Sequence, residues 1–230
     1  SGIKDYYDFT SLVQEHQIIV VKINYRLGPM GWFTHPGIQD FATGMDKSSN
    51  FGTLDIIEAL RWVKRNIGSF GGNPNNVTIF GESAGGHNVL TLLGSPASAG
   101  LFHKAISQSG YTSSFTTIEA LGIDSEGKII NALGSDSILS QHNPSSYQNI
   151  KNAYLENPEK NADQYQKYLR SIDGKELFET YQLVADKTFD RIPLATRDGL
   201  VIPLQGIQAS LEDPKNSKNI PVIAGSNKDE

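Results

Sequence analysis

The pentapeptide GESAG at residues 81–85 lies between two segments with different hydrophobic patterns. The residues before it, VTIF at 77–80, form a short β-branched and aromatic run, which predicts a buried strand. The residues after it carry apolar side chains at Val89, Leu92 and Leu93, which predicts a helix. A strand, a glycine-rich turn and a helix in this order restrict the chain to folds in which strands and helices alternate.

Other segments repeat this alternation. Residues 18–23 are β-branched and almost uninterrupted in hydrophobicity, which predicts a strand buried on both faces. Strands are also predicted over 104–107 and 220–224. A helix is predicted over 52–67, where apolar residues recur at steps of three or four: Leu54, Ile57, Leu60, Val63 and Ile67. The sequence therefore predicts an α/β fold with a mostly parallel sheet flanked by helices.

Residues 111–190 have a different composition, richer in Ser, Asn, Gln and Lys than the segments around them. Helical patterns occur near residues 115–133, 161–171 and 174–186. We expect this region to be a helical insertion or cap within one α/β domain that occupies residues 1–230.

The composition excludes several classes of function. The chain has 230 residues, 38% of them hydrophobic, which is enough for one large domain with a core. Its formal charge of −5 does not favour nucleic acid as a partner, and no apolar run approaches the roughly 18 residues of a membrane helix. Cysteine is absent, which excludes disulfides and thiol nucleophiles, and no motif calls for a metal or cofactor. The compartment stays open between secreted and cytoplasmic.

The pattern Gly-x-Ser-x-Gly between a strand and a helix is typical of a nucleophile elbow. In such a turn a strained backbone lifts the hydroxyl of Ser83 clear of the chain, and glycines at 81 and 85 let strand and helix approach closely. The N–H groups that begin the helix, including that of Ala84, would hold a developing oxyanion. The alternative is a serine that only caps the helix through its side chain.

A nucleophilic serine requires a histidine base and a carboxylate, and the chain order in α/β-hydrolases is serine, acid, histidine. The predicted strand over 220–224 leads to two candidate acids, Asp229 and Glu230, for which a solvated charged loop is the alternative. We expect none of the histidines to be the base, because all of them precede these carboxylates: His16, His35, His87, His103 and His142. His87, one helical turn beyond Ser83, is expected to pack or to face solvent.

Several ordered blocks extend well beyond the pentapeptide. They are FGGNPNNVTIFGESAGG over 70–86, NYRLG over 24–28, NFGTLD over 50–55 with ALRWV over 59–63, GLFHKAISQSG over 100–110, and the segments around 198–203 and 227–230. Together they resemble the type-B carboxylesterase/cholinesterase family of α/β-hydrolases. The resemblance is strong over residues 18–110, moderate over 191–230 and absent over most of 111–190.

The resemblance implies a role for several residues. Ser83 matches the family's nucleophile, and Ala84 matches the residue whose backbone N–H joins the oxyanion hole. Glu230, rather than Asp229, matches the acid of the triad. The chain resembles the middle of a longer family chain, an incomplete α/β-hydrolase domain. The catalytic histidine is expected beyond residue 230. The glycine-rich loop with the other oxyanion donors is expected upstream of this chain, with only Ser1-Gly2 resembling its tail.

Other matches concern supporting residues. Glu82 matches the acidic residue beside the nucleophile, which lines the gorge floor in relatives, and Ser109 matches a hydroxyl near the triad acid. Arg26 and Asp55 match a pair that forms a buried ion pair in relatives.

The function that the resemblance implies is the hydrolysis of small-molecule carboxylic esters through an acyl-enzyme, without a cofactor. Two alternatives stay open, namely a catalytically inactive binding or adhesion module and a truncated product without function. The ester itself is not specified, because pocket walls in this fold come mainly from loops and insertions. Trp32, Tyr111 and Phe115 are candidates either for pocket aromatics or for ordinary packing.

Overall fold

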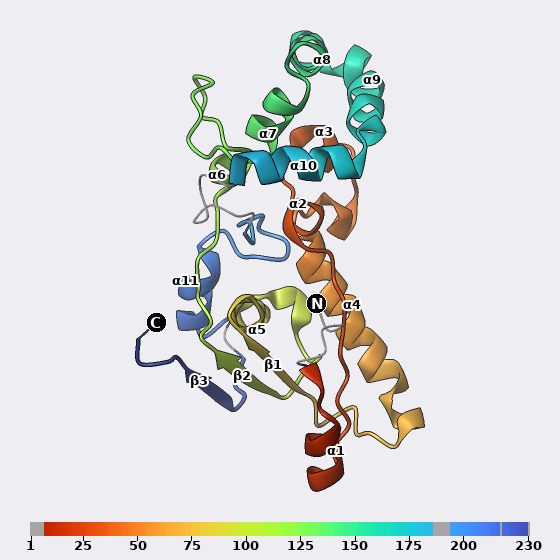
Figure 1. The fold of residues 1–230 in the computed structure, drawn as a ribbon, viewed down its shortest axis with the longest axis vertical. Coiled ribbons are helices and arrows are strands. Elements are labelled where there is room, and N and C mark those ends of the chain that lie inside the picture. The colour runs from red at the N-terminus through yellow and green to blue at the C-terminus, as the bar shows by residue number, and fades with distance from the viewer. Residues whose placement is uncertain (1–6, 186–193, 217, 230) are drawn as a thin grey trace. The chain divides into compact units, whose positions relative to one another are not determined.

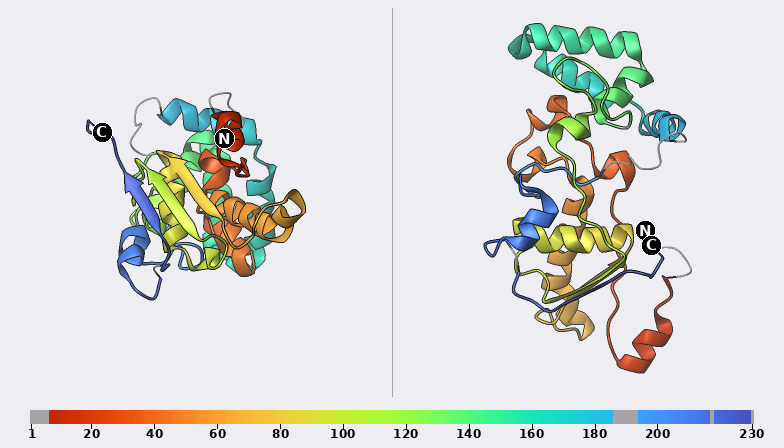
Figure 2. Two further views of the ribbon diagram at one scale, coloured as in Figure 1. Left: turned by 90° about the horizontal axis from the view of Figure 1, so that it is seen from below. Right: turned by 90° about the vertical axis from the view of Figure 1, so that its left-hand side faces the viewer.

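The computed structural model describes residues 7–185, 194–216 and 218–229. These residues form two compact units (Figures 1 and 2). The first draws on residues 1–26, 51–113 and 201–230 and contains the sheet, and the second draws on residues 27–50 and 114–200 and is mainly helical. The second unit thus includes residues 27–50, which the sequence analysis did not group with the insertion.

The sheet of the first unit is parallel. Among the described residues its strands are β1 (Thr78–Glu82), β2 (Lys104–Gln108) and β3 (Val222–Gly225), in the order β1-β2-β3. The register pairs Glu82 with Gln108 and Gln108 with Gly225, so the carboxyl ends of the strands lie side by side (Figure 2, left). The strands predicted over 77–80, 104–107 and 220–224 are confirmed, with ends shifted by at most two residues.

The helix after the pentapeptide, α5 (Ala84–Gly94), covers one face of this sheet (Figure 2, right). It packs against β1, β2 and α11 (Gly206–Glu212). Its buried apolar residues include Val89, Leu92 and Leu93, the positions that predicted it. The burial of this apolar stripe holds the first turn of α5 at the end of β1.

The carboxyl end of α5 is held by Lys218. The ammonium group of Lys218 donates hydrogen bonds to the carbonyl oxygens of Leu92, Leu93 and Ser95 at 2.9, 2.9 and 2.8 Å. These are among the carbonyls that a helix end leaves unpaired, and a cation there also opposes the negative end of the helix dipole. Burial lowers the pKa of Lys218 to about 8.

The predicted helix over 52–67 is confirmed as α4 (Phe51–Asn66), which is followed by the 3-10 turn η3 (Ile67–Phe70). Of its periodic apolar residues, Leu54 is only half-buried, and the others are buried: Ile57, Leu60, Val63 and Ile67. The first unit also contains α1 (Thr10–His16) and the 3-10 turn η4 (Pro96–Ser98).

The prediction of a doubly buried strand over 18–23 is wrong. In the structure this segment forms neither helix nor strand, and Ile18, Ile19 and Val21 are 42%, 46% and 40% exposed. A strand is stabilised by backbone hydrogen bonds to a neighbouring strand. Within the described residues no strand pairs with this segment, so its hydrophobic pattern alone does not make it one.

The prediction that the strand over 77–80 is buried is also wrong. No residue of β1 is fully buried, Phe80 is exposed, and every residue of β3 is exposed, with Ile223 at 67%. The reason is that α5 covers one face only, and β1 and β3 form the edges of the sheet among the described residues. Central β2 is the better buried strand, with Ala105 and Ser107 inside.

The second unit consists mainly of short and medium helices. Its elements are α2 (Gly28–Gly31), α3 (Pro36–Gln39), the 3-10 turn η2 (Gly44–Lys47), α6 (Thr117–Leu121), α7 (Ser135–His142), α8 (Pro144–Glu156), α9 (Pro158–Ser171) and α10 (Gly174–Ala185). α8 packs against α9, and α7 packs against α8 and α10. The helices predicted near 161–171 and 174–186 are confirmed as α9 and α10, although residue 186 lies outside the described residues.

The helix predicted near 115–133 is mostly wrong, because only residues 117–121 are helical. α6 begins with a capping box between Thr116 and Glu119, and ends at Gly122 in the left-handed conformation (φ 86°). A Cβ at Gly122 would lie 2.3 Å from the carbonyl oxygen of Asn131, so the chain folds back directly after α6. A glycine C-cap of this kind terminates a helix.

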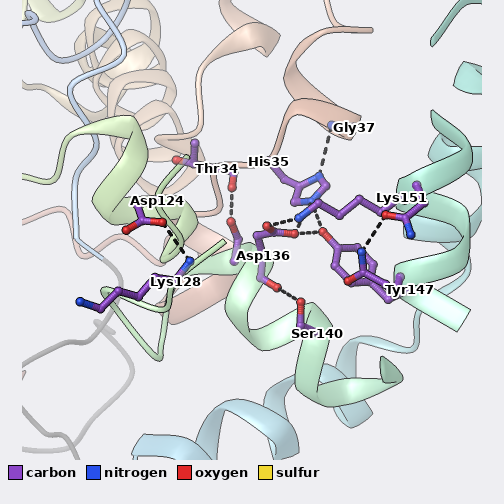
Figure 3. A network of polar contacts seen from close by, with 12 residues as sticks. Thr34, His35, Gly37, Asp124, Lys128, Asp136, Ser140, Tyr147 and Lys151 are labelled. Carbon is purple, nitrogen blue, oxygen red and sulfur yellow. Dashed lines mark hydrogen bonds and ion pairs between the residues drawn. The ribbon is translucent and has the colours of Figure 1, made fainter. Parts of the chain in front are cut away.

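A buried polar network lies in the interior of the second unit (Figure 3). Asp136 on α7 accepts hydrogen bonds from the Tyr147 hydroxyl and the Lys151 ammonium, both on α8. His35, at the start of α3, places Nε2 at 2.8 Å from the Tyr147 hydroxyl oxygen and accepts a hydrogen bond at Nδ1 from the Gly37 N–H. The network joins α3, α7 and α8 through fully partnered polar groups, as buried polar atoms require.

The protonation states of this network follow from its contacts. Burial alone would raise the pKa of Asp136, but hydrogen bonds with His35, Lys151 and Tyr147 outweigh it and lower the pKa to about 2. Burial lowers the pKa of His35 despite the nearby carboxylate, so the imidazole is neutral at pH 7. Asp136 and Lys151 therefore form the ion pair, and His35 acts as a neutral partner.

Asn50 links distant parts of the second unit. Its side-chain N–H donates to the Thr196 carbonyl and to an Asp198 carboxylate oxygen, both at 2.8 Å. Its side-chain oxygen accepts from the Thr196 N–H at 2.8 Å. The Asn50 amide thus pairs with both the N–H and the carbonyl of Thr196, as the backbone of a neighbouring strand would, and this pairing holds the segment around 194–198 in place.

None of the helices in the part of the chain that the structure describes is long and apolar enough to cross a bilayer.

Candidate active site

Ser83 connects the end of β1 to the start of α5 in a strained conformation. Its backbone has φ 54° and ψ −115°, a positive φ outside the regions that non-glycine residues commonly occupy. Such a conformation costs about 1–3 kcal/mol and persists only where the surroundings impose it. Ser83 is exposed, and within the described residues its hydroxyl makes no capping hydrogen bond to α5. The capping interpretation therefore lacks the contact that defines it.

Close glycine contacts impose this turn. A Cβ at Gly81 would lie 2.5 Å from the carbonyl carbon and oxygen of Gly85, so only glycine fits at position 81. A Cβ at Gly85 would meet nothing within 4 Å. The prediction that close packing requires glycine is therefore confirmed at position 81. At position 85 the described residues leave room for a Cβ.

A second glycine contact was missed by the sequence reasoning. A Cβ at Gly86 would lie 2.6 Å from the Gln108 carbonyl oxygen and 2.9 Å from the Gly110 Cα, and a Cβ at Gly110 would likewise meet the Gly86 backbone. The first turn of α5 therefore lies directly against the chain that leaves β2. The sequence shows only a pair of glycines at 85–86 and a Ser-Gly dipeptide at 109–110. Neither indicates that Gly86 and Gly110 lie in contact.

The N-terminal turn of α5 provides hydrogen-bond donors beside Ser83. Ala84 is the first residue of α5, so its N–H is one of those that find no acceptor inside the helix. The positive end of the helix dipole lies at the same place. The N–H of His87 is already used, because it donates to the Ser83 carbonyl at 2.9 Å. The arrangement can stabilise negative charge next to the Ser83 hydroxyl.

The aligned strand ends bring Ser109 beside the chain that follows β3. Ser83 N–H donates to the Gln108 carbonyl at 2.9 Å, and Ser109 N–H donates to the Gly225 carbonyl at 2.7 Å. Ser109 also has a positive φ of 50°. Four residues beyond Gly225 the chain reaches Asp229, which is exposed. Glu230, the predicted acid, lies outside the described residues.

Glu82 is the last residue of β1 and is exposed. It lies in register with Gln108 at the same edge of the sheet as Ser83. Glu82 therefore lies next to Ser83 at the carboxyl end of β1.

The histidines of the first unit are engaged in other contacts. His87 is buried, and its Nδ1 lies 2.8 Å from the Tyr111 carbonyl oxygen. His103 precedes β2 and accepts at Nδ1 from the Val77 N–H at 3.2 Å, at the opposite end of the strands from Ser83. His16 ends α1 and is exposed. The expectation that His87 packs holds, since its ring also stacks on Tyr111.

The histidines of the second unit belong to its helices. His35 is part of the network around Asp136, and the Nδ1 of His142 lies 3.0 Å from the Thr180 hydroxyl. Trp32 and Phe115, two of the aromatic residues considered as candidates for a pocket, line one cavity of this unit together with Thr34, Ser135 and Tyr181.

Arg26 and Asp55 form the predicted ion pair, but not a buried one. The backbone N–H and Nε of Arg26 donate to Asp55 Oδ2 at 2.9 Å, and Nη2 donates to Oδ1 at 2.7 Å. The Arg26 side chain is 52% exposed, so the expected burial is wrong. The hydrogen bonds from Arg26 lower the pKa of Asp55. The guanidinium also lies over the Phe51 ring, 5.2 Å from its centroid.

Known proteins are similar to this chain in sequence and in fold. A family model described as the carboxylesterase family matches residues 1–230. The chain belongs to the carboxylesterase family. Para-nitrobenzyl esterase of Bacillus subtilis (strain 168) is 47% identical over 120 residues, which are 52% of this chain and 24% of that protein. Cocaine esterase of Homo sapiens is 50% identical over 109 residues, covering 47% of this chain and 18% of that protein.

Solved structures of family members agree. The match to a PNB esterase structure covers all of this chain and 43% of the PNB esterase chain, with a TM-score of 0.76 and 29% sequence identity. The match to a Geobacillus stearothermophilus carboxylesterase structure covers all of this chain and 41% of the carboxylesterase chain, with a TM-score of 0.75 and 31% sequence identity. The α/β-hydrolase fold predicted from the sequence is therefore confirmed, and the chain spans less than half the length of these solved relatives.

Proposed function

We propose that the protein containing this chain hydrolyses carboxylic esters, with Ser83 as the nucleophile. The observation that carries the proposal is the backbone of Ser83, whose positive φ presents an exposed hydroxyl between β1 and the N–H groups of α5. A serine with a purely capping role has no need of this strain. Membership in the carboxylesterase family and the esterase names of the relatives support the same assignment.

The reaction would proceed in two stages. The Ser83 Oγ attacks the ester carbonyl carbon while a histidine takes the hydroxyl proton. The negative charge on the carbonyl oxygen is then held by the Ala84 N–H at the start of α5, together with donors from the family's glycine-rich loop. The bond to the alcohol breaks, the alcohol leaves with the proton, and water hydrolyses the acyl group from Ser83.

We assign the supporting roles by position. Glu230 follows β3 and would orient the histidine, and Ser109 lies beside the end of β3 through its 2.7 Å backbone contact to Gly225. Glu82 would line the floor of the site next to Ser83. The base is assigned to the family's histidine, which the chain order of α/β-hydrolases places after the acid, and not to His87, which is held by Tyr111, or His103, which lies at the other end of the strands.

The test is ester hydrolysis by the full-length protein, with p-nitrophenyl butyrate as substrate. Ser83→Ala should lower kcat/KM by about a thousandfold or more, since the nucleophile has no substitute. The matched control is Ser69→Ala, at an exposed serine of η3, which should leave the rate unchanged. A folded wild-type protein that hydrolyses no ester would instead favour an inactive binding module, and full activity in Ser83→Ala would refute the assignment.

A further inference from the structure

His87 has no role in the mechanism proposed above, yet it is one of the most constrained polar residues in the first unit. It is 4% exposed, one helical turn beyond Ser83, and its own N–H donates to the Ser83 carbonyl. Its Nδ1 lies 2.8 Å from the carbonyl oxygen of Tyr111. Because a carbonyl oxygen only accepts hydrogen bonds, Nδ1 must carry the proton.

The surroundings of the other ring nitrogen of His87, Nε2, indicate whether the imidazole is neutral or charged. Nε2 of His87 is buried and has no hydrogen-bond partner among the described residues. With the proton on Nδ1, a neutral ring leaves only a lone pair there, whereas a charged ring would bury a second N–H without an acceptor. Burial lowers the pKa of His87, which agrees with a neutral ring.

Tyr111 is held by His87 in a second way. The two rings are stacked, with centroids 4.3 Å apart and an angle of 13° between their planes. Next to this stack, Gly86 and Gly110 touch through their backbones, with no room for a side chain at either position. The loop that leaves β2 is thus fixed on the first turn of α5 by a backbone contact, a hydrogen bond and a ring stack.

The Tyr111 ring is only half-buried, so part of it stays exposed beside this turn. Burial, together with the nearby Tyr25, raises the pKa of Tyr111, so its hydroxyl is protonated at pH 7. On the same helix, the Asn88 side chain donates to the Tyr25 hydroxyl at 3.0 Å. A neutral, rigid aromatic surface is therefore presented close to the turn that carries Ser83 and Ala84.

We propose that His87 is a positioning residue whose Nδ1–H bond to the Tyr111 carbonyl fixes Tyr111 as an apolar wall of the substrate site, so that the pair selects esters with larger apolar groups. This inference rests on the proposed function. Tyr111 touches the substrate and determines specificity, and His87 acts through it. Loss of the hydrogen bond would let the loop move and weaken the discrimination between large and small esters, while Ser83 and the N–H groups of α5 keep their geometry.

The test compares kcat/KM for p-nitrophenyl hexanoate and p-nitrophenyl acetate in the full-length protein. Tyr111→Ala, at a half-buried site, should lower the hexanoate-to-acetate ratio about tenfold, mainly through KM. His87→Phe keeps the ring stack but loses the donor, and should lower the ratio about fivefold, the effect of one lost hydrogen bond. His87→Asn places an amide N–H where Nδ1 lies, and should restore the ratio to within twofold of wild type. His103→Asn is the matched control at the other end of β2.

Nitrogen NMR of the wild-type imidazole gives an independent readout, in which a neutral ring with the proton on Nδ1 is expected. The inference is overturned if either Tyr111→Ala or His87→Phe leaves the ratio unchanged in an enzyme that hydrolyses esters, or if the proton resides on Nε2. Failure of the wild-type protein to hydrolyse either ester would overturn the proposed function first, and this inference with it.

Discussion

Gly81 lies so close to Gly85 that a Cβ atom at position 81 would sit 2.5 Å from the Gly85 carbonyl, whereas a Cβ at position 85 would meet no atom of the described residues within 4 Å. The two glycines of the pentapeptide are therefore not equivalent. The contact brings β1 and α5 together at Ser83 and forces the turn between them into its strained conformation.

This asymmetry predicts different effects for two alanine substitutions. Gly81→Ala should destabilise the full-length protein by about 1–3 kcal/mol, because the overlap is with backbone that cannot move freely. Gly85→Ala should cost much less. Urea unfolding of both variants measures the difference, and equal losses of stability would contradict the contact.

The buried network around Asp136 predicts a large loss of stability on removing one charge. Asp136→Asn leaves the Lys151 ammonium without its carboxylate inside the second unit, where breaking a buried pair costs about 3–5 kcal/mol. Asp163→Asn is the control, because its pair with Lys167 is exposed on α9 and contributes little. Denaturation midpoints that shift equally for both variants would show that the network is not a buried one.

The same carboxylate predicts a loss of stability in acid. The pKa of Asp136 is about 2 in the folded protein and about 3.9 in an unfolded chain. Because the folded value is the lower one, the stabilisation is complete above about pH 5 and is lost as the pH falls towards 2. It amounts to about 2–3 kcal/mol.

His35 acts in the same direction, since its pKa is lowered by burial. The unfolded chain therefore binds a proton at this residue that the folded chain excludes, and stability declines below about pH 6.5. Urea midpoints from pH 7 to pH 3 should show both declines in the wild type. Asp136→Asn should remove the component below pH 5, and a curve of unchanged shape would speak against this assignment.

The exposure of Arg26 changes the expected cost of breaking its pair with Asp55. A buried pair would imply a loss of 3–5 kcal/mol, but with Arg26 half in solvent we expect about 1 kcal/mol for Asp55→Asn. The loss should shrink further in 1 M salt. A loss of more than about 3 kcal/mol that does not respond to salt would show that the pair is buried in the intact protein.

Local patterns predicted the parts of the fold that local interactions decide. The turn at Ser83 and α4 and α5 followed from glycine spacing and a 3.6-residue period, which depend on residues close in sequence. The strand predicted over residues 18–23 is wrong because a strand requires a hydrogen-bonded partner strand, and the hydrophobic pattern of one segment does not show whether such a partner exists. The helix predicted near 115–133 ends already at Gly122, because a single glycine C-cap terminates it whatever apolar pattern follows.

In the candidate site, too, features that depend on residues close in sequence could be predicted, and contacts between distant segments could not. Ser83 and Ala84 could be named from the pentapeptide and its flanks, while the contacts of Gly86 with Gly110 and of His87 with Tyr111 join segments more than twenty residues apart. His87 was expected to pack or to face solvent, and nothing in the sequence around it indicated that its partner is the carbonyl group and ring of Tyr111. Similarly, no pattern around Asn50 indicated that its amide pairs with Thr196.

The role of Ser83 as nucleophile can be tested by covalent labelling of the full-length protein with an organophosphonate ester, followed by peptide mapping. We expect one phosphonyl group per chain, attached to the Oγ of Ser83, and no label in Ser83→Ala. A label on another serine, or equal labelling of the wild type and Ser83→Ala, would contradict the claim that the strained serine between β1 and α5 is the nucleophile.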